Sequence, residues 1–173
     1  YLYMLADNGV VVSSVAPVVN IPDYPERDVV VNALYSLPRP VALDAGAIAT
    51  EAGVPKAENM AMAGAATAFM PFDLSDYGPI VEKLFGKKGP EMVAANMKVL
   101  ENGYRVGRFT RLLLEAGLPG TVACRALAMV RPDSLDEARV PQVKALLQGP
   151  RVAAAFDRPR EGLITLDELA ELS

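Results

Sequence analysis

The chain has 173 residues, of which 51% are hydrophobic, and its 17 Lys and Arg against 21 Asp and Glu give a formal net charge of −4. This length suits one domain with an appended subdomain, and the absence of a basic cluster argues against nucleic-acid binding. The sequence contains no histidine and a single cysteine, Cys124. It therefore cannot by itself build a zinc site, a Cys-ligated iron–sulfur cluster, or a Ser–His or Cys–His catalytic dyad.

Two further features concern location. No apolar run approaches the roughly 20 residues that a membrane-spanning helix needs, and no secretory signal is visible. One cysteine cannot form an internal disulfide, which is typical of a reducing compartment. We therefore expect a cytoplasmic protein that makes no contact with a membrane.

The first 43 residues predict alternating helices and strands. Tyr1–Ala6 reads as the tail of a helix, and the β-branched run Val10–Val15 reads as a buried strand. Asp28 is expected to cap a helix that continues to about Leu37, and a second strand follows from Pro40 or Val41 to Leu43. This order favours an α/β fold with a mostly parallel sheet covered by helices.

From Ala45 onward the pattern is mainly helical. Ala57–Phe69 predicts a buried helix in which Gly64 lets another element approach closely. New helices are expected to start at Pro79 and at Pro90, because proline suits the first turn of a helix. Asn96 falls on the apolar stripe of the second of these, whose other members are Val93, Met97, Leu100 and Tyr104.

The last third of the chain also predicts helices. Asp133 or Ser134 is expected to cap a helix that runs to about Gln148. Thr165 and Glu168 have the spacing of a capping box for a final short helix. We interpret this region as a helical C-terminal extension.

A few polar residues are candidates for a functional site. Asp44 follows the second strand, and ligands of open α/β sheets bind at the carboxyl ends of strands, although a helix-capping role also accounts for it. Asn59 and Asn96 are amides on otherwise apolar faces, so each either satisfies backbone groups inside the chain or fixes a partner or ligand. Lys88 lies in a Gly-Lys-Lys-Gly turn that lacks the preceding strand of a phosphate-binding loop.

Several spaced segments resemble one protein family. They are Leu43-Asp44-Ala45, then the run over 55–65 (PKAENMAMAGA), then the run over 84–89 (LFGKKG), and Asn96 followed by Asn102-Gly103-Tyr104. Together they are similar to the gamma-type domain of 2-oxoacid:ferredoxin oxidoreductases, and especially to the beta subunit of indolepyruvate oxidoreductase. The resemblance implies a partial gamma-type domain over 1–110 and a helical extension over 111–173.

The chain departs from the family pattern at its start. The family domain begins with a strand and a glycine-rich turn, and here that N-terminal part is missing. The expectation is that another polypeptide, or a part of the protein that precedes Tyr1, supplies it. A sheet that begins midway would leave an open edge and apolar surface to be covered.

The resemblance also implies a function. It indicates a non-thiamine-binding subunit or fragment that supports oxidative decarboxylation of a 2-oxoacid, such as indolepyruvate, to an acyl-CoA. Thiamine diphosphate, iron–sulfur clusters and coenzyme A are then implied in the complex, with this chain in a hetero-oligomer that passes electrons indirectly to ferredoxin.

The residues predicted to face the partner or the active site are Asp44, Asn59, Lys88 and Asn96, with no catalytic and no metal-binding residue in this chain. Two rival hypotheses remain. One is a non-enzymatic α/β module that binds a protein or a small ligand, and the other is a stand-alone enzyme that uses Asp44 and Lys88 as an acid–base pair.

Overall fold

The computed structural model describes residues 2–149, 156 and 162–172. Its sheet consists of two parallel strands, β1 (Val11–Ser14) and β2 (Pro40–Leu43), with Val12 paired to Val41 and Ser14 to Leu43. Helix α1 (Arg27–Tyr35) connects the strands. The predicted parallel pairing is therefore confirmed. Among the described residues the sheet has only these two strands.

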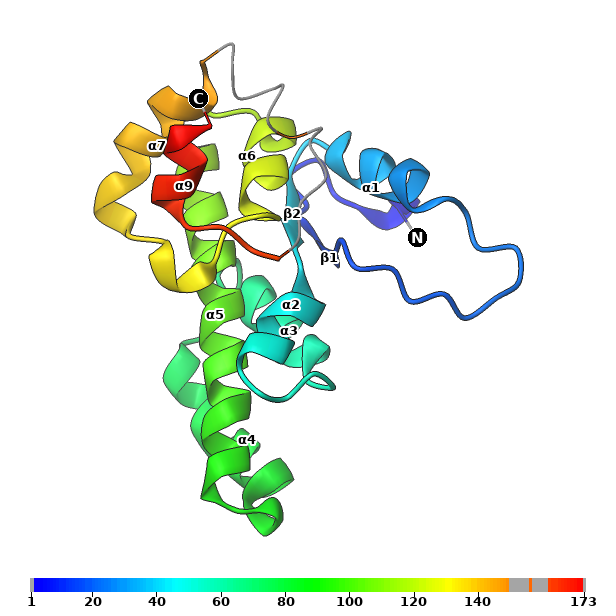
Figure 1. Ribbon diagram of the computed structural model, residues 1–173, viewed down its shortest axis with the longest axis vertical. Coiled ribbons are helices and arrows are strands. Elements are labelled where there is room, and N and C mark those ends of the chain that lie inside the picture. The colour runs from blue at the N-terminus through cyan, green and yellow to red at the C-terminus, as the bar shows by residue number, and fades with distance from the viewer. Residues whose placement is uncertain (1, 150–155, 157–161, 173) are drawn as a thin grey trace.

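Helices build the rest of the molecule (Figure 1). The longest, α5, has 26 residues and runs along the long axis of the molecule. Besides α1, the α-helices whose residues the structure describes are α2 (Ala45–Glu51), α3 (Glu58–Thr67), α4 (Gly78–Phe85), α5 (Pro90–Glu115), α6 (Gly120–Leu127), α7 (Val140–Leu147) and α9 (Leu166–Glu171). Short 3-10 helices occupy Leu2–Met4, Leu74–Tyr77, Gly86–Lys88, Pro132–Ser134 and Glu137–Arg139.

Helices α3 and α5 pack with their backbones in direct contact. A Cβ atom added to Gly64 would clash with the carbonyl oxygen of Leu100, and one added to Gly103 would clash with that of Ala61. Gly107 makes the same kind of approach to Ala65. The prediction that Gly64 admits a neighbouring element is confirmed, and glycines on both helices permit this packing.

Three boundaries differ from the sequence prediction. Leu2–Met4 forms an exposed 3-10 turn where the tail of a helix was expected, since nothing buries its apolar side chains. Glu26 occupies the N-cap of α1, so Asp28 lies in the first turn. Two 3-10 turns precede α7, which starts at Val140 and not after Ser134, because Pro141 suits a first turn.

One hydrophobic cluster holds the two parts of the chain together. It contains Val41 and Leu43 of β2 as well as Leu113, Leu127 and Leu166 from beyond residue 110, all at most 1% exposed. Helix α5 crosses residue 110 without interruption. The predicted boundary between 1–110 and 111–173 therefore lies inside α5, and residues from both sides of it share one core. The division into two domains stays a prediction.

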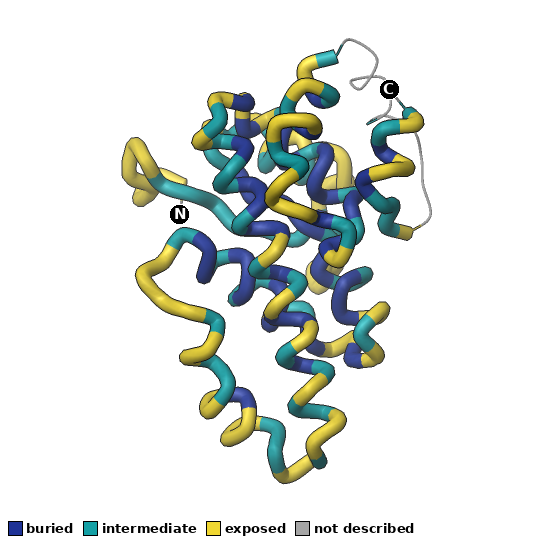
Figure 2. The backbone as a smooth tube through the Cα atoms, turned by 90° about the vertical axis from the view of Figure 1, so that its left-hand side faces the viewer, coloured by how far each residue is buried: buried dark blue, intermediate teal, exposed yellow. Residues whose placement is uncertain are grey.

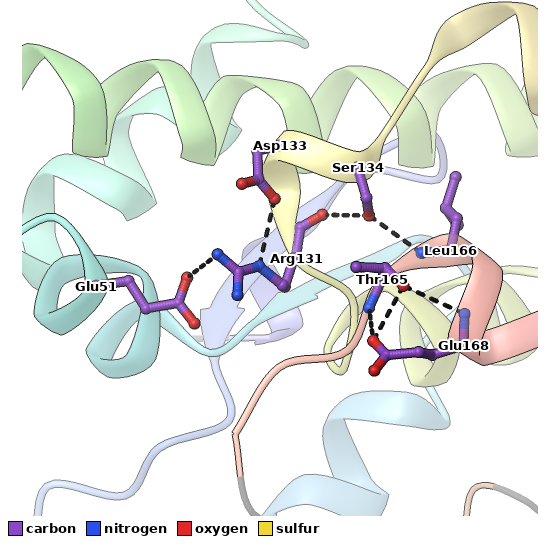
Figure 3. A network of polar contacts seen from close by, with 7 residues as sticks. All are labelled: Glu51, Arg131, Asp133, Ser134, Thr165, Leu166 and Glu168. Atoms are coloured by element: carbon purple, nitrogen blue, oxygen red, sulfur yellow. Dashed lines mark hydrogen bonds and ion pairs between the residues drawn. The ribbon is translucent and has the colours of Figure 1, made fainter.

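A polar network joins the C-terminal region to α2 (Figure 3). Arg131 forms ion pairs with Glu51 of α2 at 3.6 Å and with Asp133 at 3.4 Å. Its carbonyl oxygen accepts a hydrogen bond from Ser134 Oγ, which in turn accepts one from the Leu166 N–H at 3.1 Å. The start of α9 is thereby fixed next to the end of α6.

Helix α9 begins with the predicted capping box. The Glu168 N–H donates to Thr165 Oγ1 at 3.2 Å, and the Thr165 N–H donates to Glu168 Oε2 at 2.7 Å (Figure 3). The prediction from the spacing of these residues is confirmed. These two bonds satisfy backbone donors that a helix otherwise leaves free at its first turn.

Candidate functional site

Polar groups gather at the carboxyl ends of the two strands. Asp44, which follows β2, accepts a hydrogen bond from the Ala47 N–H at 2.9 Å and so caps α2. Ser14 Oγ, at the end of β1, accepts bonds from the N–H groups of Ala16 and Ala45 at 3.2 and 3.3 Å. The capping role proposed for Asp44 is confirmed, and its carboxylate remains half-buried at the sheet edge.

The first turn of α3 lies close to Asp44. A Cβ atom added to Gly46 would be 3.6 Å from Asp44 Oδ1 and 3.5 Å from Glu58 Oε1, so both carboxylates approach the same glycine. Asn59 follows Glu58 directly in α3. The carboxyl edge of the sheet thus brings the Asp44 and Glu58 carboxylates near one another, and Glu58 was not singled out from the sequence.

Asn59 was expected on an otherwise apolar face, and the structure shows that it is exposed. The buried residues of α3 are Met60, Ala61, Gly64, Ala65 and Thr67. They recur at helical spacing, and Asn59 falls outside their stripe. Its amide is therefore open to a partner, and the prediction that it faces one remains untested.

Asn96 differs from Asn59 in burial. Only 2% of its surface is exposed, and its Nδ2 donates to the carbonyl oxygen of Met92 at 2.8 Å. The cost of burying the amide is offset by that bond within α5. Asn96 thus satisfies a backbone group inside the chain, and any role toward a partner stays a prediction.

Lys88 lies far from the sheet, in the turn between α4 and α5. This turn forms the lower tip of the molecule in Figure 1, where Figure 2 shows mainly exposed and intermediate residues. Lys88 is exposed, and its Nζ is 5.8 Å from the centre of the Phe85 ring. Gly89 ends the turn with φ 102°, a conformation that favours glycine.

The sequence did not indicate the cavity that Asp44 lines. This space of about 750 Å³ lies among α1, α6 and the carboxyl ends of both strands. Arg125 of α6 reaches it, donates to Asn32 Oδ1 at 3.3 Å and lies 5.2 Å from the centre of the Tyr35 ring. The only available signal was a lone arginine in the otherwise small and apolar segment over 122–129.

Burial controls the titration of two groups beside this cavity. Desolvation raises the pKa of the Tyr35 hydroxyl to about 12, and the nearby Cys124 adds to the rise. Desolvation also raises the pKa of the Cys124 thiol to about 12. Cys124 is fully buried and is therefore a neutral packing residue at physiological pH.

The described residues contain no group of three or more His, Cys, Asp or Glu side chains placed to hold a metal ion. Likewise, within the described part of the chain, no helix combines the length and apolarity needed to cross a lipid bilayer. All buried side-chain nitrogen and oxygen atoms there have a hydrogen-bond partner. The candidate site therefore consists of polar groups at the sheet edge and the adjoining cavity.

Comparison with protein families gives a match over the first part of the chain. Residues 1–106 match the family described as pyruvate ferredoxin/flavodoxin oxidoreductase, which is 106 of the 173 residues. No curated protein and no solved structure matches the chain. The family match covers β1, β2 and the helices up to most of α5, and it ends before α6.

Proposed function

The chain belongs to the pyruvate ferredoxin/flavodoxin oxidoreductase family, and we propose from this membership that it is a non-thiamine-binding subunit, or part of one, of a 2-oxoacid:ferredoxin oxidoreductase. The family consists of oxidoreductases that function in multi-subunit complexes. The family match over residues 1–106 is the observation that carries the proposal. The resemblance of the segment over 55–65 further supports an aryl pyruvate such as indolepyruvate as the substrate.

The cofactors associated with this family do not fit the residues of this chain. Its one cysteine is fully buried, so it cannot ligate an iron–sulfur cluster. The described residues also lack a carboxylate cluster for the metal ion that accompanies a diphosphate. Coenzyme A carries several phosphate charges, whereas the cavity is lined by two carboxylates, those of Asp28 and Asp44. We infer that partner subunits hold these groups.

Exposed apolar residues support a role in assembly. Val18, Val19 and Ile21 of the loop between β1 and α1 are each at least 53% exposed, and Ile80 and Leu84 lie one turn apart on α4 at 53% and 62%. Monomers rarely expose large contiguous apolar patches, and such patches are typical of protein interfaces. The proposed partner is a subunit that contains thiamine diphosphate and iron–sulfur clusters. We further propose a cytoplasmic hetero-oligomer, since a single cysteine is typical of a reducing compartment.

Co-expression with such a subunit tests the proposal. We expect a brown complex that contains iron and thiamine diphosphate and that oxidises an aryl pyruvate in the presence of coenzyme A and ferredoxin. Absorption spectra, metal analysis and acyl-CoA formation measure this outcome. The 173-residue chain without its partner is the control and should be inactive.

Two results would contradict the proposal. One is turnover of a 2-oxoacid by the isolated chain, because that would require chemistry for which its side chains are unsuited. The other is failure of the chain to associate with any subunit that carries thiamine diphosphate and clusters. Activity with pyruvate but not with aryl pyruvates would reject only the proposed substrate.

A further inference from the structure

The cavity at the carboxyl ends of the strands has the size and position of a small-molecule site. Its volume of about 750 Å³ falls within the range of roughly 300–1,000 Å³ typical of ligand pockets. Val15 and Asp44, which follow β1 and β2, both line it. Ligands of parallel sheets bind at this end of the strands. Nothing in the family match assigns a ligand to it.

Arg125 supplies a positive charge that no carboxylate of the described residues neutralises. Among the ion pairs of the described residues none involves Arg125, whose hydrogen-bond partner is the neutral Asn32 amide. The Tyr35 ring packs against the guanidinium, and its hydroxyl is uncharged at physiological pH because its pKa is about 12. Packing of a ring against a guanidinium leaves the N–H groups at its edge available for an anion.

The other charges around the cavity disfavour an anion that carries more than one negative charge. Arg27 forms an ion pair with Asp28 at 3.6 Å, so these two lining residues offset one another. Asp44 adds a further negative charge to the lining. A doubly charged phosphate would be repelled by this aspartate, whereas one carboxylate matches the one unpaired guanidinium.

Apolar side chains complete the lining. Val31 of α1 and Ala128 and Met129 at the end of α6 face the same space as Arg125. Such a combination of an apolar wall with a few polar groups orients a ligand that has an apolar body and a charged end. We propose that this cavity binds a small organic carboxylate, with its carboxylate group on Arg125 and its apolar body against Val31 and Met129.

The two halves of the proposed site come from different parts of the chain. Val15, Val31 and Asp44 lie within the family-matched residues, whereas Arg125 and Met129 follow residue 106. The C-terminal region therefore adds the anion-binding group to a cavity at the sheet edge. The inference does not depend on the proposed role in 2-oxoacid oxidation, since the matched region alone lacks Arg125.

Titration of the full 173-residue chain with simple carboxylates tests the site. Benzoate, phenylacetate and hexanoate are the probes, inorganic phosphate is the contrasting anion, and calorimetry gives the affinity. We expect one carboxylate per chain to bind, and the methyl resonance of Met129 to shift in ¹³C NMR spectra. Arg125→Gln should weaken binding at least about tenfold, because a charge-assisted hydrogen bond is lost.

Two further variants separate binding from folding. Arg105→Gln removes an exposed arginine of α5 that does not line the cavity, so it should bind with unchanged affinity. Arg125→Lys keeps the charge but not the forked donor geometry, and it should bind more weakly than the native chain. Thermal unfolding of each variant establishes that it is folded, and Arg125→Lys decides the matter if Arg125→Gln does not fold.

Several outcomes would overturn the inference. They are no saturable binding of any of the three carboxylates up to millimolar concentration, equal affinity in the native chain and a folded Arg125 variant, or tighter binding of phosphate than of the carboxylates. If the carboxylates shift other methionine resonances but not that of Met129, binding occurs elsewhere, and this result would also reject the inference.

Discussion

Asp44 shows how one side chain can serve the fold and remain available for recognition. One carboxylate oxygen accepts the Ala47 N–H, which stabilises the start of α2, and the side chain is still half-buried at the sheet edge. An aspartate cap and an asparagine cap have similar strength. The capping role can therefore be separated from any role of the negative charge.

Replacement of Asp44 tests this separation. Asp44→Ala should lower the free energy of unfolding by about 1 kcal/mol, and Asp44→Asn should leave it nearly unchanged. If the carboxylate faces the partner subunit, Asp44→Asn should nevertheless weaken assembly, measured by titration of the partner. Asp136→Asn is the matched control, because Asp136 caps a 3-10 turn in the C-terminal region through the Ala138 N–H. Equal assembly of both variants would contradict a role for the Asp44 charge.

The capping box of α9 makes part of the stability depend on pH. The backbone and side-chain hydrogen bonds from Thr165 lower the pKa of Glu168 below its usual value. A lowered folded-state pKa adds stability above about pH 4.3, and this contribution is lost as the pH falls through the folded-state value. Glu168→Gln should therefore lose less thermal stability than the native chain between about pH 5 and pH 3. Glu101→Gln, at an exposed position of α5, should behave like the native chain.

At the scale of elements, the α3–α5 pair depends on the absence of side chains. Gly103 and Gly107 of α5 lie against backbone oxygens of Ala61 and Ala65. A methyl group at either glycine would clash, because the atoms it meets belong to the backbone of α3 and cannot rotate away. The interhelical distance is thus fixed by glycine more than by large side chains.

Gly103→Ala should reveal this dependence. Alanine improves intrinsic helix propensity by about 1 kcal/mol, but the clash with the Ala61 carbonyl should cost more, so a net loss of about 1–3 kcal/mol is expected. Gly78→Ala is the control, since nothing lies within 4 Å of an added Cβ at the start of α4. Urea unfolding measures both variants. Equal stability of Gly103→Ala and the native chain would refute the close packing.

These elements also show how far the sequence could predict the fold. The β-branched run and the strand before Asp44 identified a parallel pair, and Gly64 identified a close helix contact, because each depends on local chemistry. The exposure of Asn59 was missed, since composition alone does not say which face of an apolar helix is covered. Arg125 was missed because its cavity forms only when α6 packs beside α1.

At the scale of the whole molecule, the region beyond residue 110 is part of the core. Leu127, Leu166 and Leu169 are at most 1% exposed and share a cluster with Leu43 of the sheet. Arg131 adds a polar link to Glu51. The part that matches the family, residues 1–106, and the C-terminal part therefore stabilise each other.

Truncation provides the test at this scale. A chain limited to residues 1–110 should lose cooperative unfolding, because the apolar surface that Leu113 and the later leucines cover would be exposed to water. Circular dichroism and dispersion of amide resonances measure the loss. Removal of residues 1–6 should have little effect, since Leu2, Tyr3 and Met4 are at least 60% exposed. A cooperative transition in the 1–110 chain would contradict the shared core.

Among the described residues β1 pairs with β2 along one edge only, and this has a consequence for hydrogen–deuterium exchange. The Val11 N–H donates to the carbonyl of Arg39, just before β2, and the Val15 N–H donates to that of Leu43. In a parallel ladder the N–H groups of Val12 and Ser14 therefore point away from β2. Amide exchange along β1 should therefore alternate, with fast exchange at Val12 and Ser14 and slow exchange at Val11, Ser13 and Val15. Attachment of a further strand by a companion subunit would slow the fast positions, and the alternation would disappear.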